Sequence, residues 1–149
     1  MRRVRSAMKV YADSNVFITP LVSEATPKSA SSMRVLAEVE SGSVTAFTSV
    51  LTWDEVAWVV RKLMGRGDSV SAGEKLSGFP NLRFVSASEE IMRLAQKLVG
   101  SHDILPRDAI HAATAISKEV DVFVSDDSDF DRLGQLKRMS PESFASRKS

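Results

Sequence analysis

The sequence predicts an α/β fold, in which a mostly parallel sheet is covered by helices on both faces. Short apolar segments alternate with helical segments along the chain, which is typical of parallel strands joined by helices. The 149 residues amount to about one domain, and no linker or internal repeat divides them, so we expect a single domain over 1–149. The helix that follows Pro106 is apolar on nearly every face, which indicates a buried helix.

The first elements follow from apolar segments and a helix stop signal. Residues 9–12 give a short apolar strand that ends on Asp13, and residues 14–22 give one or two helical turns. Apolar residues at helical spacing then predict a helix over 28–40, which ends at Gly42. A carboxylate therefore comes directly after the first strand.

The middle of the chain contains the longest predicted helix. A strand over 44–47 leads into a helix over 50–64, which Thr48 or Ser49 caps and the sequence GRG stops. A more polar helix with poor periodicity is expected over 69–77.

Three strands and two helices complete the expected order. A strand over 82–85 precedes a helix over 89–99, whose first turn carries two glutamates where the helix dipole favours negative charge. The apolar helix begins at Pro106, a residue suited to the first helical position, and a short apolar strand over 122–124 follows it. An edge strand is expected over 136–139.

Composition and charge exclude several classes of protein. The net charge is +1, so binding of nucleic acid would need a local basic patch. The chain has no cysteine, which excludes disulfides and thiolate metal sites and suits a cytoplasmic protein. No apolar run reaches about 18 residues, so no membrane span is expected. The basic start is not a signal peptide, because Asp13 and Asn15 interrupt its apolar part. We expect residues 1–7 and 142–149 to be loosely ordered.

Carboxylates gather at the ends of these elements. They are Asp13 after the first strand, Glu55 in the 50–64 helix, Asp108 in the first turn of the apolar helix, and Asp126, Asp127, Asp129 and Asp131 after the 122–124 strand. In a parallel sheet these acids point toward one edge, where ligands bind. Oxygen ligands without cysteine or histidine suit Mg²⁺ or Mn²⁺ rather than zinc. Such ions polarise phosphoryl oxygens, so the residues predict an acidic metal site for phosphoryl chemistry.

Each acid also has a simpler explanation. Asp13 could be a turn residue at a strand end, and Asp108 could serve only the helix dipole. Glu55 could pair with Arg61 or Lys62 on its own helix. Their joint occurrence in an alternating α/β frame favours one shared site over these separate explanations.

Three large side chains near these acids are expected to be structural. His111, one turn after Asp108, is expected to lie in the core or to support the site rather than to bind the ion. Trp53 and Trp58 lie on an apolar helix, which favours a core or interface position over base stacking.

Four segments, in order, resemble the motifs of a known family. They are YADSNVFI, TSVLTWDEVAWVV, DAIHAATA and VSDDSDFDRL. Over Lys9 to about Leu133 the chain resembles the PIN-domain ribonucleases, in particular the VapC-type toxins of toxin–antitoxin pairs. Ser14 and Ser125 stand where that family more often has threonine. The doubled Asp126–Asp127 leaves the register of the last motif open, and its spacing from Ser125 favours Asp127.

The resemblance implies a three-layer α/β/α sandwich and endonucleolytic cleavage of RNA that depends on Mg²⁺ or Mn²⁺. It implies that Asp13, Asp108 and Asp127 bind the ion. Glu55 would bind it or orient the attacking water, and Asp129 would be a less certain, outer ligand. Asn15 and Ser125 would be hydrogen-bond donors that fix the orientation of the carboxylates.

Partners and substrate contacts are expected as well. The resemblance implies a homodimer and an antitoxin protein, and the apolar residues of either 28–40 or 50–64 could supply an interface. Our own inference for RNA contacts rests on basic residues near the acids, namely Arg61, Lys62, Arg66, Arg107 and Arg132. Two other functions stay open, a receiver-like signalling domain and a PIN-like binding module that no longer cleaves.

Overall fold

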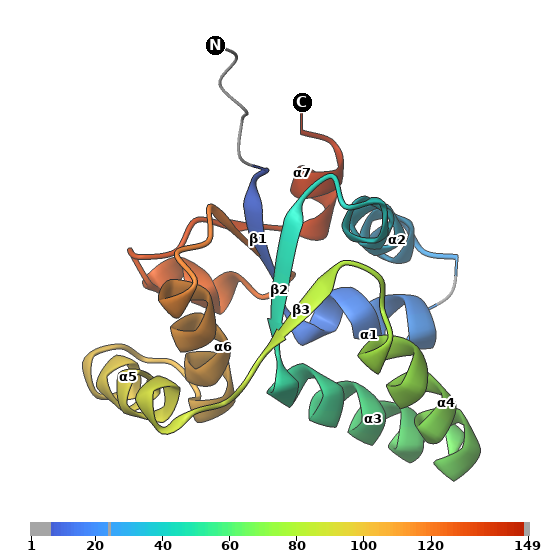
Figure 1. The fold of residues 1–149 in the computed structure, drawn as a ribbon, viewed down its shortest axis with the longest axis horizontal. Helices are drawn as coiled ribbons and strands as arrows, with labels where there is room; N and C mark the ends of the chain where they lie inside the picture. Colours follow the sequence, from blue (N-terminus) through green and yellow to red (C-terminus); the bar gives the residue numbers. More distant parts are fainter. Residues whose placement is uncertain (1–6, 24, 148–149) are drawn as a thin grey trace.

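The computed structural model describes residues 7–23 and 25–147, in which short strands alternate with helices (Figure 1). The strands are β1 (Lys9–Ala12), β2 (Thr45–Ser49), β3 (Leu82–Val85), β4 (Val122–Val124) and β5 (Arg138–Met139). The helices are α1 (Ser14–Val22), α2 (Pro27–Ser41), α3 (Val50–Met64), α4 (Arg66–Ser77), α5 (Glu89–Ser101), α6 (Pro106–Ser117) and α7 (Pro141–Ala145), with a 3₁₀ helix η1 (Ser128–Arg132). The predicted basic lead-in lies outside the described residues, apart from Ala7.

The strands form a parallel sheet in the order β3-β2-β1-β4-β5. β1 lies at its centre, where Tyr11 is level with Phe47 of β2 and Phe123 of β4. Because all pairs are parallel, the carboxyl ends of the strands share one edge of the sheet. The predicted α/β fold with a parallel central sheet is therefore confirmed.

Two hydrophobic cores lie on opposite faces of the sheet, as the alternation of side chains along a strand requires. Val10 and Ala12 of β1 face one core, and Tyr11 between them faces the other. Helices α5 and α6 cover the core of Tyr11, and α1, α2, α3, α4 and α7 cover the other core. Figure 1 shows α5 and α6 on one side of the strands and α1 to α4 on the other. The three layers of the predicted sandwich are thus observed.

The beginning of α3 is fixed by short polar contacts to the centre of the sheet. Ser49 ends β2 and its hydroxyl accepts a hydrogen bond from the Leu51 backbone at 3.0 Å, which caps the helix. Thr48 donates to the Ala12 carbonyl at 2.8 Å and pairs with Thr52 at 2.7 Å. These buried contacts place α3 directly at the carboxyl edge of β1.

The prediction of a loose tail over 142–149 is wrong for the residues described there. Phe144 of α7 is fully buried in the core, and Arg147 binds Glu38 of α2 through two hydrogen bonds of 2.8 and 2.9 Å. The missed signal was a helix start, because Ser140 caps α7 and Pro141 occupies its first position. Apolar burial of Phe144 then offsets the entropy of ordering this segment.

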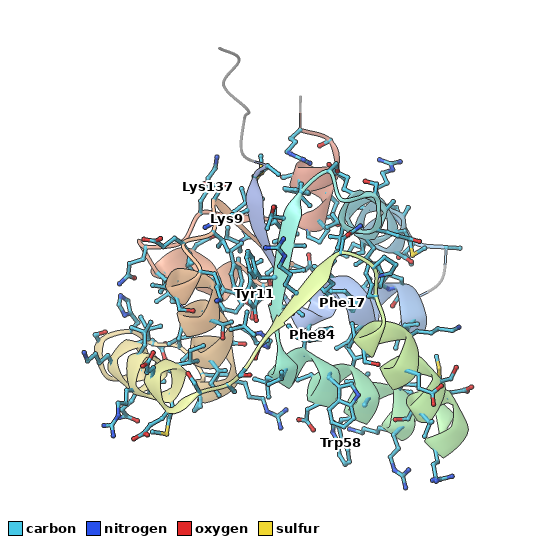
Figure 2. The ribbon with its side chains drawn as sticks, in the orientation of Figure 1. Lys9, Tyr11, Phe17, Trp58, Phe84 and Lys137 are labelled. Atoms are coloured by element: carbon cyan, nitrogen blue, oxygen red, sulfur yellow. The ribbon has the colours of Figure 1, made fainter. Side chains whose placement is uncertain are left out.

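Two other expectations also need correction. The polar helix begins at Arg66 rather than Ser69, since Gly65 alone, with φ 97°, makes the turn between α3 and α4. Trp53 and Trp58 were expected in the core or at an interface, and the core position is wrong: they are 50% and 59% exposed, and Figure 2 shows Trp58 on the outer side of α3. The buried side of α3 follows Thr52, Val56 and Val60 instead. In the described part of the chain, no helix has the length and apolarity needed to cross a membrane.

Candidate active site

Asp13 is the centre of the polar cluster at the carboxyl edge of the sheet. Its backbone N–H donates to the Val124 carbonyl at 3.0 Å, which continues the pairing of β1 with β4. Its side chain caps α1 by accepting from the Ser14 backbone at 2.9 Å, and the residue is only 4% exposed. Burial raises the pKa of Asp13, although His111 and the hydrogen bonds from Ser125 and Ser14 act in the opposite direction.

Asn15 and Ser125 hold the Asp13 carboxylate and the acidic loop together. Asp13 Oδ2 accepts from Ser125 Oγ at 2.7 Å and from Asn15 Nδ2 at 3.2 Å. Ser125 Oγ accepts in turn from Asn15 Nδ2 at 3.0 Å and from the Asp127 backbone at 3.1 Å. Asn15 Oδ1 accepts from the Asp126 backbone at 3.2 Å. Both residues therefore have the contacts expected of donors that fix a carboxylate.

Asp108 lies in the first turn of α6 and carries the clearest electrostatic sign of a cluster. Its pKa is raised to about 6, first by burial and then by the negative charges of Asp13 and Asp127, with a smaller contribution from Glu55. Within the described residues its carboxylate makes no hydrogen bond to a side chain or backbone group. α6, β1, α3 and the loop after β4 thus bring their acids within electrostatic reach of one another.

The acids of the loop after β4 divide into paired and unpaired groups. The pairs are Lys28–Asp126 at 3.0 Å, Arg132–Asp129 at 3.6 Å and Arg138–Asp131 at 2.8 Å. Asp127 has no such cation within 4.0 Å among the described residues, and instead its Oδ1 accepts from the Asp129 backbone at 2.9 Å. Its negative charge also acts on Asp108. This geometry favours Asp127 over Asp126 as the inward acid.

Glu55 borders the buried side of α3, with 18% of its side chain exposed. Its Oε1 meets the Nε2 of His111, so its partner is neither Arg61 nor Lys62. The neighbouring Asp54 is exposed, because adjacent helical positions point about 100° apart. The structure therefore places Glu55 toward the acid cluster and Asp54 in solvent.

His111 is the second polar residue of α6, after Asp108, that contacts this cluster. It is 1% exposed, and its Nδ1 lies 2.6 Å from the Tyr11 hydroxyl. Burial acts to lower the pKa of His111, but the hydrogen bond to Glu55 and the charges of Asp13, Glu55 and Asp108 outweigh burial and raise it. The expectation that His111 supports the site from the core agrees with these contacts. Tyr11 was missed, and only its alternation with Val10 and Ala12 hinted at its side of the sheet.

The remaining candidates lie farther out. Arg61 and Lys62 are exposed and lie about 9 to 11 Å along α3 from Glu55. Arg66 and Arg107 are exposed too, whereas Arg132 donates to the Asp103 carbonyl at 2.7 Å. The Asp129 side chain is 49% exposed beside Arg132. RNA contacts through these basic residues, and ligation by Asp129, stay predictions.

The donor set suits a hard divalent ion in its chemistry. Asp13, Asp108, Asp127 and Glu55 offer only oxygen atoms, the type of ligand that Mg²⁺ and Mn²⁺ prefer. Across residues 7–23 and 25–147, no three Asp, Glu or His side chains already form a ready-made metal group. The raised pKa values of Asp13 and Asp108 are nevertheless what repulsion and burial produce where a cation would relieve them.

The fold and the site define an α/β/α protein with a parallel five-stranded sheet and a cluster of acids at the carboxyl edge of that sheet. A family model described as the PIN domain matches residues 10–136, so the chain belongs to the PIN domain family. The strand order, with β1 between β2 and β4, also differs from the 2-1-3-4-5 order of receiver domains, so the receiver-like alternative is wrong.

Solved structures share this fold at low sequence identity. VapBC2 from Rickettsia felis, bound to a promoter DNA fragment, superposes with a TM-score of 0.71 at 16% identity, covering 89% of this chain and 98% of that one. VapC20 from Mycobacterium tuberculosis, a sarcin–ricin loop cleaving toxin, gives 0.68 at 19%, covering 84% and 95%. FitAcB from Neisseria gonorrhoeae gives 0.66 at 17%, covering 89% and 97%. Among curated proteins, none matches this sequence.

Proposed function

We propose that this protein is a metal-dependent endoribonuclease that hydrolyses RNA phosphodiester bonds and acts as the toxin of a toxin–antitoxin pair. The observation that carries the proposal is the gathering of acids at one edge of the sheet, where Asp13 and Glu55 both lie beside His111 and the charges of Asp13, Asp127 and Glu55 act on Asp108. Membership of the PIN domain family and the likeness of the fold to VapC20, described as a sarcin–ricin loop cleaving toxin, support it.

The roles of the side chains follow from their environments. Asp13, Asp108 and Asp127 would hold Mg²⁺ or Mn²⁺, with Asn15 and Ser125 keeping the Asp13 carboxylate in orientation. When bound, such an ion supplies positive charge to the phosphoryl oxygens and lowers the pKa of water. Glu55, held at the margin of the cluster, would bind the ion together with these acids or orient the water for in-line attack on phosphorus.

A partner antitoxin and a second copy of the chain belong to the same proposal. Structures similar in fold are described as VapBC assemblies and a toxin–antitoxin complex. Met33 of α2 lines an apolar cavity of about 350 Å³, together with Phe17, Leu36 and Phe79. α3 presents Trp58 and Leu63 to solvent. The two helices named as interface candidates thus both offer apolar surface to a partner.

The test is cleavage of RNA by the purified protein in Mn²⁺ or Mg²⁺, with and without chelator. We expect cleavage that needs the ion and is crippled by Glu55→Gln. The matched control is Asp54→Asn, because Asp54 is the adjacent acid and is exposed. Ion-independent cleavage, or equal loss in both variants, would refute the assignment. Metal binding without cleavage would favour the remaining alternative, a PIN-like binding module.

A further inference from the structure

The two ring nitrogens of His111 face two different groups, which ties three elements of the fold together. Nδ1 lies 2.6 Å from the Tyr11 hydroxyl of β1, and Nε2 meets Glu55 Oε1 of α3. Nε2 is also 3.6 Å from Asp13 Oδ1, too far for a hydrogen bond but close enough for an electrostatic contact. One buried ring thus touches both a strand residue and two of the proposed site acids.

The positions of the protons follow from the partners. A carboxylate in its ionised form only accepts hydrogen bonds, so we assign the proton between His111 and Glu55 to Nε2. Nδ1 is then the acceptor of the hydrogen bond from the Tyr11 hydroxyl. The same hydroxyl accepts a hydrogen bond from the Ser49 backbone N–H at 3.0 Å. A chain of hydrogen bonds therefore runs from the end of β2 through Tyr11 and His111 to Glu55.

Tyr11 is itself held rigidly, so it can fix the ring that it contacts. Its ring stacks on Phe123 with centroids 5.0 Å apart and an interplanar angle of 4°, and it meets His111 edge-on at 5.8 Å. Tyr11 is fully buried between the sheet and α6. Glu55, by contrast, extends from α3 on a flexible side chain that would otherwise have several rotamers.

We infer that His111 is a positioning residue that aims the Glu55 carboxylate at the Asp13 and Asp108 acids. Ser49 and Tyr11 hold its ring, and Nε2–H holds Glu55. This inference rests on the proposed function, because it assigns a role in the same site. A buried imidazole needs a partner for each ring nitrogen, and here the partner of Nε2 is a proposed site acid rather than a backbone group of the core.

Two substitutions of His111 distinguish its contact with Glu55 from its contact with Tyr11. In His111→Gln the side-chain amide reaches about as far as Nε2 and can still donate to Glu55, whereas in His111→Asn it ends near the position of Nδ1. His111→Asn should weaken Mn²⁺ binding, measured by calorimetry on the full chain without RNA, by about 10- to 100-fold. His111→Gln should retain most of the affinity. His102→Asn, at a histidine that pairs with Ser101, is the matched control and should bind Mn²⁺ as wild type does.

A metal-free measurement covers the case in which these variants fold poorly. The imidazole Nε2–H of His111 in the wild type should give a slowly exchanging proton resonance in NMR spectra. Glu55→Gln should shift this resonance, because it replaces the carboxylate that accepts the proton. Absence of the resonance, or no shift in Glu55→Gln, overturns the role of His111.

The outcomes for this role and for the nuclease differ. If wild type cleaves RNA but His111→Asn binds Mn²⁺ and cleaves as wild type does, the positioning role is wrong and the nuclease stands. If wild type binds Mn²⁺ without cleaving and His111→Asn binds it less tightly, the nuclease is wrong and the positioning role stands. If wild type binds no Mn²⁺, both are wrong.

Discussion

Two groups of acids at the same edge of the sheet have opposite electrostatic environments. The outer acids of the loop after β4 each face a cation, as in Asp131 with Arg138, and that contact lowers the pKa of Asp131. Of the inner acids, Asp13 is buried and Asp108 is half-buried, both beside other carboxylates, and the pKa values of both are raised. Identical side chains thus serve two purposes: the outer ones stabilise the loop, and the inner ones store repulsion that a bound cation can relieve.

Substitution of Asp108 should have the largest effect among the inner and outer acids. Asp108→Asn should reduce cleavage by more than the roughly 100-fold typical for loss of an outer partner, since Asp108 is a proposed ligand. In chelator the variant should melt at or above the temperature of wild type, because the change removes repulsion and no side-chain hydrogen bond within the described residues. Melts with and without Mn²⁺ check this prediction.

The same melts with added Mn²⁺ measure how much the ion stabilises each protein. Wild type should gain about 2.7 kcal/mol at Mn²⁺ concentrations of 100 Kd, and Asp108→Asn should gain less. Asp13→Asn is a poorer probe of stability, because Asp13 accepts hydrogen bonds from Ser14, Asn15 and Ser125 that an amide cannot all accept. A large loss of stability in chelator for Asp108→Asn would mean that the acid is structural.

The next effect should distinguish the two adjacent acids of the loop. Asp127→Asn should lose metal-dependent cleavage, because Asp127 acts on Asp108 and has no cation of its own within the described residues. Asp126→Asn should retain much of the activity, because Asp126 faces Lys28. Initial rates of RNA cleavage across a Mn²⁺ titration measure both variants. Equal losses would contradict the division into inner and outer acids.

A pH titration should show the inner repulsion in the metal-free protein. The pKa of Asp108 is about 6 in the folded state against 3.8 for the free side chain, so between these values the folded state binds more protons. The stability contributed by this group is therefore full below about pH 4 and is lost as the pH rises toward 6. The difference in the free energy of unfolding between wild type and Asp108→Asn, measured with denaturant across this pH range, should show this slope. A difference independent of pH over this range would contradict it.

Most of the fold and of the acid cluster could be predicted because both depend on local patterns. The strand ending on Asp13 and the first turn carrying Asp108 follow from apolar runs and helix signals, and a parallel sheet brings such ends together. The hydrogen-bond partners of the buried polar residues could not be predicted in this way. The contact of Tyr11 with His111 joins residues 100 positions apart, and no periodicity specifies it.

The dependence of burial on contacts between distant parts of the sequence also explains the wrong predictions outside the acid cluster. Phe144 looked like part of a loose tail because its burial depends on a space between α2 and the sheet that no local pattern reveals. For Trp53 and Trp58 the apolar helix favoured a core or interface position, and only the exposure of both side chains excludes the core. Lys28 and Arg138, which face the loop acids, lie about 100 residues before and a few residues after them.

The smallest effects should come from the cations that face the outer acids. Arg138 donates to both oxygens of Asp131 at 2.8 and 3.1 Å and to the Ser125 carbonyl at 3.0 Å, so it holds both ends of the loop that carries Asp127. Its side chain is 17% exposed, so Arg138→Gln should lower the free energy of unfolding by about 1 to 2 kcal/mol.

Lys28→Gln should do less than Arg138→Gln, because the Lys28–Asp126 pair is a single contact of 3.0 Å between side chains 63% and 39% exposed. Its effect should fade in high salt, which screens exposed charges, whereas part of the effect of Arg138→Gln should persist because the hydrogen bond of Arg138 to the Ser125 carbonyl is partly buried. Melts of both variants at low and high salt measure this. If Lys28→Gln weakened Mn²⁺ binding as much as Asp127→Asn, then Asp126 would belong to the inner acids and the cation beside it would be part of the site.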